Sequence, residues 1–156
     1  MEKIPDPKEL EKELVKGGRG LPGYENITSI KGISDRSGTI LLSIIDNVQN
    51  FESEKKLASY FGIVPKVDKS NEKNHSGHIT KKGSKLGRTT LVQCTKSAIK
   101  YSPILNQFYN RLKAKKGSGM ATIATAKKML GIIFLTLKND WVFEDFPSGI
   151  LKNHAC

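Results

Sequence analysis

Apolar residues recur at the three- and four-residue spacing of an α-helix through most of this chain. No segment alternates apolar and polar residues as a half-buried strand does. The clearest stripe would face one side of a helix and consists of Ile40, Leu41, Ile44, Ile45 and Val48. A chain of 156 residues is about the size of one domain. The pattern therefore predicts an all-α fold, a compact helical domain.

A short helix is expected before this domain. Asp6 followed by Pro7 is typical of a helix start, and Leu10 and Leu14 give the helix one apolar side. Two leucines are too few to form a core, so we expect the helix either to pack on a partner helix in a homo-oligomer or to be the remnant of a longer, coiled-coil-like connecting segment. The expected parts are an amino-terminal helix, the helical domain and a tail, at residues 1–18, 24–146 and 147–156.

Further helices are expected within the domain. Ser53 and Gly62 would bound one of them, with Leu57, Tyr60 and Phe61 facing the core. Helical spacing returns after residue 83 and continues to residue 101, and a new helix is predicted from Ser102-Pro103. The segment KAKKGSG is expected to separate that helix from a last long one.

The positive charge of the chain is concentrated in one segment. The net charge is +11, and residues 73–139 hold fourteen lysines and arginines but no aspartate or glutamate. Helix surfaces usually carry both signs, because opposite charges four residues apart are mildly stabilising. A long segment of one sign indicates an external polyanion, so nucleic acid is the expected partner. A basic surface that serves only solubility is the alternative.

A short turn within residues 24–51 resembles the turn of a helix-hairpin-helix element. In Lys31-Gly32-Ile33-Ser34, glycine would let the backbone approach a phosphate, and the following helix would offer unpaired N–H groups. Ile33 would lie under the turn. Gly32, Ile33 and Ser34 are therefore expected nucleic-acid contacts. The usual pattern has a second glycine where this chain has Ser34, and an ordinary packing corner between helices is the alternative.

A polar segment before the basic helix holds the candidate for chemistry. In NHSGHITKKGSKLGR, residues 74–88, Ser76 precedes the expected contacts Lys81, Lys82, Gly83, Lys85 and Arg88. Basic side chains stabilise charge in phosphoryl transfer, and a serine oxygen can attack phosphorus and form a covalent DNA linkage. Ser76 is therefore a candidate nucleophile, and an ordinary loop serine is the alternative.

Other chemistries lack their motifs. Gly83 and Gly87 do not fit the phosphate-binding pattern G-x-x-x-x-G-K-[ST], and no G-x-S-x-G surrounds Ser76. Residues 73–139 contain no carboxylate to hold magnesium, and Cys94 and Cys156 form no CxxC pair, so no metal or cofactor is expected in this chain. No signal segment is evident, and the longest apolar run is far shorter than the roughly 20 residues of a membrane span. A cytoplasmic protein without a membrane segment is expected.

Five motifs in order resemble the carboxy-terminal domain of the insertion-sequence family one-ten transposases, also called the one-sixteen and nine-oh-two family. They are SIKGIS, IIDNVQNFESEKKLASYFGIVP, SGHITKKGSKLGRTTL, KYSPILNQFYNRLKAKKG and ATAKKMLGIIFLTLK. The resemblance covers residues 27–138 and includes the spacing Tyr60-x-Gly62-x-x-Pro65. Gly38 stands where the family usually has alanine.

The resemblance implies that this chain is one part of a larger transposase. Full-length members look like a RuvC-like nuclease domain with acidic magnesium ligands, a coiled-coil connection and this domain. The family is understood to recombine DNA under the guidance of a structured RNA, with a serine of this domain in the active site. Carried onto this chain, that serine is Ser76, with Ser84 as the second candidate. The chain would then be part of a transposase that binds nucleic acid but is inactive alone. A stand-alone helix-hairpin-helix module without catalysis is the alternative.

Overall fold

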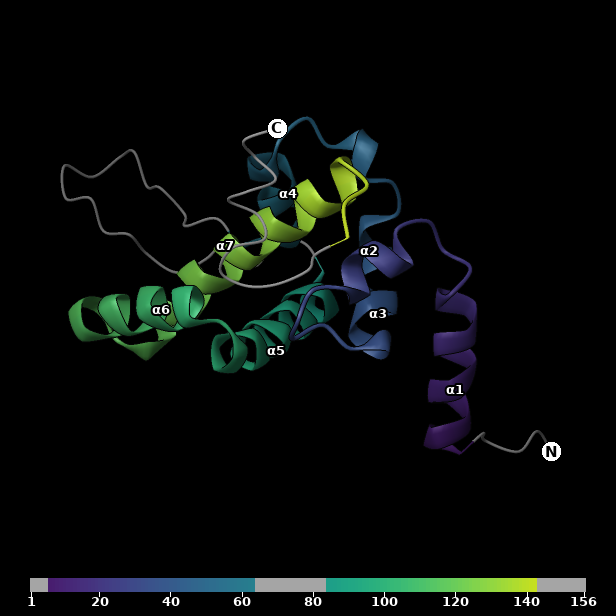
Figure 1. Cartoon of the computed structure of the whole chain (residues 1–156), viewed down its shortest axis with the longest axis horizontal. Coiled ribbons are helices and arrows are strands. Elements are labelled where there is room, and N and C mark those ends of the chain that lie inside the picture. The colour runs from purple at the N-terminus through teal and green to yellow at the C-terminus, as the bar shows by residue number, and fades with distance from the viewer. Residues whose placement is uncertain (1–5, 64–83, 143–156) are drawn as a thin grey trace.

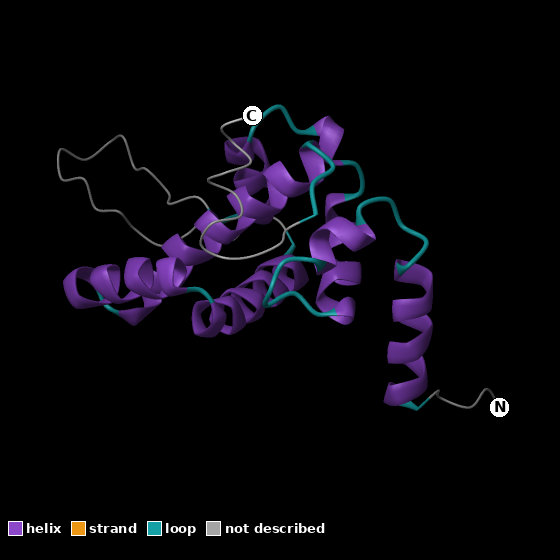
Figure 2. Ribbon diagram, in the orientation of Figure 1, coloured by secondary structure: helices purple, strands orange, loops and turns teal. Residues whose placement is uncertain are grey.

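A computed structural model describes residues 6–63 and 84–142 (Figure 1). Its elements are α1 (Pro7–Gly18), α2 (Tyr24–Thr28), α3 (Asp35–Ile45), the 3-10 turn η1 (Val48–Asn50), α4 (Glu54–Phe61), α5 (Lys85–Tyr101), α6 (Pro103–Lys116) and α7 (Ser118–Lys138). Every regular element of the described ranges is helical (Figure 2). The prediction of an all-α domain is confirmed.

Side-chain caps explain where several helices start. Ser53 accepts the backbone N–H of Lys56 at 3.3 Å and begins α4. Ser102 accepts the N–H of Leu105 at 3.1 Å and begins α6. Such caps satisfy N–H groups that have no partner within the helix. These helix starts lie where the sequence predicted them.

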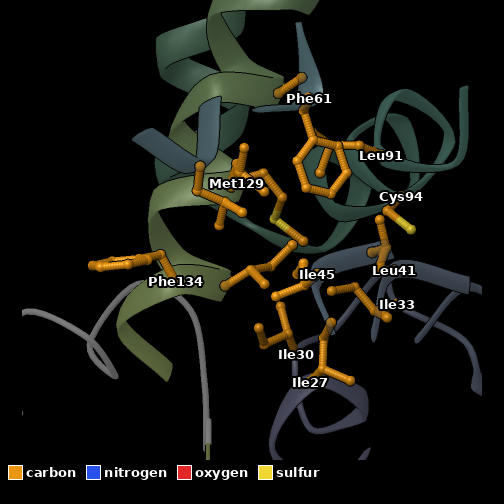
Figure 3. Packing of buried hydrophobic residues seen from close by; sticks show 14 of the residues in the cluster. Ile27, Ile30, Ile33, Leu41, Ile45, Phe61, Leu91, Cys94, Met129 and Phe134 are labelled. Carbon is orange, nitrogen blue, oxygen red and sulfur yellow. The ribbon is translucent and has the colours of Figure 1, made fainter. Parts of the chain in front are cut away.

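Helix α7 is the centre of the domain. It packs against α2, α4, α5 and α6, and its Met129, Leu130 and Ile133 are almost completely buried. Figure 3 shows Met129 among side chains from other helices, including Ile45 of α3 and Phe61 of α4. Helices far apart in sequence therefore share one core, which holds α3, α4 and α5 in fixed positions around α7.

Helix α7 is also long and apolar enough to span a membrane by composition alone. An 18-residue window reaches a mean hydropathy of 1.5, and half of that window is buried inside the domain. The central helix of a helical domain satisfies the same criteria. The expected absence of a membrane segment was based on the shorter run at residues 130–137, so it stays a prediction.

Helix α1 joins the rest of the structure through its carboxy-terminal end. Gly18 is buried against α3, where a Cβ would overlap the side chain of Thr39. Further along α1, Leu10 and Leu14 are 47% and 37% exposed. Figure 1 shows α1 at one end of the molecule and the α6–α7 turn at the other.

Several local expectations were wrong. Tyr60 was expected to face the core but is 50% exposed, and its ring packs edge-on against Phe51 and Phe61. The segment KAKKGSG is no separator. Helix α6 continues through three of its lysines, which lie near the negative end of the helix dipole, and Gly117 alone, with φ +87°, connects α6 to α7.

Candidate nucleic-acid interface

The predicted hairpin turn packs directly against the basic helix α5. Gly32 has φ +103°, and a Cβ on it would stand 2.8 Å from the backbone nitrogen of Ala98. Ile33 is 6% exposed and Ile30 is fully buried, so both apolar side chains of the turn lie under it in the core. The turn is therefore held on α5 by close backbone contact and by two isoleucines.

Ser34 does not require the backbone freedom of glycine. Its φ is −79°, and its hydroxyl accepts the N–H of Ser37 at 3.1 Å as the cap of α3. The next residue, Asp35, places a carboxylate in the first turn of α3. Both features oppose anion binding at this helix end, since one N–H is already bonded and a negative charge lies beside it.

The Tyr24 hydroxyl lies under the same helix end. It is buried and forms no hydrogen bond with the described residues. Burial raises the pKa of Tyr24, and the nearby Asp35 carboxylate acts in the same direction. The hydroxyl therefore stays protonated and uncharged at neutral pH and adds no negative charge to the hairpin.

An open depression lies where the hairpin meets α5. It has a volume of about 480 Å³ and is lined by Lys31, Gly32, Ile33, Ser34, Ser97 and Tyr101. Tyr101 is 62% exposed. The three hairpin residues predicted as contacts thus share one surface with the carboxy-terminal half of α5.

The basic residues at the start of α5 differ in their surroundings. Lys85 is exposed. Arg88 is partly buried, and its guanidinium donates to the Phe61 carbonyl at the end of α4, with an N···O distance of 3.4 Å. Ser84 caps the helix by accepting the N–H of Gly87 at 3.0 Å. Lys85 is therefore free to meet a phosphate, whereas Arg88 and Ser84 also hold the fold together.

The predicted contacts fall into two groups at opposite ends of α5. Gly32 touches α5 at Ala98, and Arg88 lies ten residues earlier, about 15 Å along the helix axis. One exposed stripe connects the two ends, and we call it the α5 stripe. It consists of Lys85, Thr89, Gln93, Lys96 and Lys100.

Lys96 and Lys100 were missed by sequence reasoning. They follow Lys85 by eleven and fifteen residues, which brings all three to one helix face. The buried side of the helix, with Leu91 and Ala98, faces the opposite way. The same periodicity that predicted the core would have identified them.

Four predicted site residues lie outside the described residues: Ser76, Lys81, Lys82 and Gly83. Their roles stay predictions. Within the described ranges, no group of three or more histidine, cysteine, aspartate or glutamate side chains could hold a metal ion. The sequence-based expectation that the chain holds no metal also covers residues outside those ranges, so it stays a prediction.

A family profile and two known proteins match this chain over overlapping residues. The profile of the family described as "Transposase IS116/IS110/IS902 family" matches residues 24–110, from α2 into α6. An "Insertion element IS110 uncharacterized 43.6 kDa protein" of Streptomyces coelicolor is 23% identical over 126 residues, covering 80% of this chain and 31% of that protein. A "Probable family 20 transposase" of Pseudomonas aeruginosa is 18% identical over 135 residues, covering 84% of this chain and 40% of its own length. The chain thus spans about a third to two fifths of the length of these relatives.

Proposed function

Because this chain belongs to the IS116/IS110/IS902 transposase family, we propose that it forms the DNA-binding carboxy-terminal part of an insertion-sequence transposase. The family match over residues 24–110 carries this proposal. Within the proposal, the domain holds DNA and supplies a serine to the recombination reaction. A separate RuvC-like domain supplies the acidic residues that bind magnesium.

The surface of α5 supports a DNA-binding role. The α5 stripe carries three lysines and two neutral polar side chains and no carboxylate, over about 22 Å of helix. Lysine, threonine and glutamine side chains are common donors to phosphate oxygens. The hairpin depression lies beside the stripe at the carboxy-terminal end of α5, where Ser97 and Tyr101 line it, each one residue after a lysine of the stripe.

The serine of the proposal is Ser76, with Ser84 as the second candidate. In the reaction, the serine oxygen attacks a DNA phosphorus, the bond from phosphorus to the leaving 3′ or 5′ oxygen breaks, and that oxygen takes up a proton. Ser84 already has a structural task, because its oxygen accepts the Gly87 N–H. This engagement favours Ser76 as the nucleophile.

Further partners belong to the same proposal. Leu10 and Leu14 are exposed on α1 and would pair with the same helix of a second copy. A structured guide RNA would direct the choice of target, and the protein would act on DNA in the cytoplasm. The proposed DNA-binding role of α5 does not depend on the pairing through α1, on the guide RNA or on the location in the cytoplasm.

The test uses recombination and binding together. The chain is combined with the nuclease domain of its own transposase, a donor DNA and a guide RNA, and wild type is compared with Ser76→Ala. We expect Ser76→Ala to abolish recombination and to change DNA affinity by less than about two-fold, because an uncharged hydroxyl contributes little to phosphate binding. Full recombination by Ser76→Ala would contradict the nucleophile. If wild type binds DNA but supports no recombination in any combination, the non-catalytic binding module is favoured.

A further inference from the structure

A second cationic surface lies on α6 and α7, away from the α5 stripe. Here the ring of Phe108 holds two cations from two helices: Lys128 Nζ is 4.5 Å and Arg111 Cζ is 5.7 Å from the ring centroid. On the neighbouring side of α6, Lys113 Nζ lies 6.0 Å from the centroid of Tyr109. Contact with an aromatic face restricts where these long side chains can move.

Two adjacent depressions extend this surface. One, of about 380 Å³, is lined by Phe108 and by Lys55, Lys127 and Lys128. The other, of about 250 Å³, shares Ala124 and Lys127 with the first and reaches Lys116. Glu54 is the one carboxylate among their lining residues. The whole area therefore has a strongly positive rim over an apolar floor.

The two surfaces face different ways. Lys127 and Lys128 are on the exposed side of α7, whereas Met129 and Leu130 face the core that α7 shares with α5. The α5 stripe in turn points away from that core. Figure 1 shows α5 between α6 and α3, with the α6–α7 turn at the end of the molecule opposite to α1. One straight duplex on the α5 stripe would not reach the Phe108 surface.

We propose that the Phe108 surface binds the sugar-phosphate backbone of a second DNA duplex, so that one domain joins two duplexes. The proposal rests on the DNA-binding role proposed above and extends it. The cations are spread along both helices, at residues 111–116 and 127–128, which suits a chain with a charge at every step. Cations already cover the rings, so they are placed for phosphates and not for stacked bases. By holding Arg111 and Lys128 in place, Phe108 lowers the entropy lost when a phosphate binds.

The main test is the number of short duplexes bound per chain. The full chain is titrated with a duplex of about 12 base pairs, long enough for one surface only, and stoichiometry is measured by native mass spectrometry. We expect two duplexes per wild-type chain and one for Arg111→Gln/Lys128→Gln. The matched control, Lys96→Gln/Lys100→Gln, changes two lysines of the α5 stripe and should also bind one. Thermal melting of each variant checks that it is folded.

A bridging assay tests the consequence. The assay uses the Leu10→Ser/Leu14→Ser background, so that two copies paired through α1 cannot bridge the duplexes. In this background the chain with both surfaces should capture a fluorescent duplex on beads that carry a second, biotinylated duplex, and each double variant should lose at least about nine tenths of this capture. Phe108→Leu keeps both charges but removes the ring. It should weaken binding of the second duplex by about three-fold with an unchanged salt dependence.

The outcomes separate the two proposals. If wild type binds one duplex and Arg111→Gln/Lys128→Gln binds it unchanged, the Phe108 surface is overturned while the α5 stripe stands. Bridging that survives in this variant would overturn it too. A third result would also overturn the inference: a poly-glutamate peptide binds wild type but not the variant, while both bind the same number of duplexes. The surface would then bind an acidic protein segment. If wild type binds no duplex, the proposed function fails and this inference fails with it.

Discussion

The Cα of Gly32 lies against the backbone of Ala98, and this contact joins the hairpin turn to the basic helix. A Cβ on residue 32 would come within 2.9 Å of the Ala98 nitrogen, Cα and Cβ. The φ of +103° adds a second constraint, since residues with a side chain rarely adopt it. Glycine is required at this position for the packing of the protein itself, independently of any contact with DNA.

Gly32→Ala should therefore destabilise the domain strongly. We expect the free energy of unfolding to fall by about 2 kcal/mol or more, from backbone strain and the clash with α5 combined. Urea denaturation measures the loss. Gly117→Ala is the matched control, because Gly117 also has positive φ, +87°, but a Cβ there would have nothing within 4 Å. It should cost less than Gly32→Ala, because the strain of its backbone, with φ +87° and ψ 167°, is not joined by a clash. Equal losses at both positions would show that the Ala98 contact contributes nothing.

Ser84 allows its two possible roles to be separated. Its hydroxyl caps α5 by accepting the Gly87 N–H, so Ser84→Ala should reduce the free energy of unfolding by about 1 kcal/mol. Asparagine is an equally good cap without a hydroxyl, so Ser84→Asn should restore stability. The reconstituted recombination reaction then decides the chemistry. We expect Ser84→Asn to recombine DNA like wild type, and a stable but inactive Ser84→Asn would instead identify Ser84 as the nucleophile.

Lys85 and Arg88 should respond differently to neutralisation. Lys85→Gln removes an exposed charge, so the slope of log affinity against log salt should fall by about one unit with no change in melting temperature. Arg88→Gln also removes the donor to the Phe61 carbonyl. It should lower the salt slope by a similar amount and cost about 1 kcal/mol of stability as well. Fluorescence anisotropy at several salt concentrations, with thermal melting, gives both quantities. A salt slope that stays the same in Lys85→Gln would remove this residue from the interface.

The sequence predicted the fold well because local signals and core packing agree. Ser53 and Ser102 cap helices where expected, and Gly62 ends α4 with φ +71°. The helix ends that the sequence did not predict depend on backbone conformation or on tertiary contacts. Asp46, with φ +61°, ends α3 before Val48, which lies in a 3-10 turn and not in the predicted stripe.

The site was predictable in composition but not in arrangement. The excess of basic residues pointed to residues 73–139, which include α5, yet nothing in the order of residues indicated that Gly32 packs on α5 at Ala98, at the other end of the helix from Arg88. Gly38 is a similar case. It departs from the alanine expected in the family, and in the structure a Cβ there would stand 2.8 Å from the Thr28 side chain of α2. Such long-range packing is fixed only when the helices are assembled.

Cys94 should make the domain less stable at high pH. The thiol is 2% exposed, and burial raises its pKa above the ordinary value of 9.0, with a smaller opposing effect from the Ser37 hydroxyl. In the unfolded chain the thiol has its ordinary pKa and loses its proton as pH rises through that value, whereas the folded protein retains it. The raised pKa therefore contributes stability below the unfolded pKa, and this contribution is lost above it.

The measurement compares urea unfolding at pH 8 and pH 10, in a Cys156→Ser background so that Cys94 is the one thiol present. The protein with Cys94 should lose about 1 kcal/mol more over this interval than Cys94→Ala, which has no thiol to ionise. Tyr24 and the lysines are common to both proteins, so their titration cancels in the comparison. The cavity left by alanine lowers stability at both pH values and does not affect the difference. An identical pH dependence in the two proteins would mean that the thiol ionises as readily inside the domain as in water.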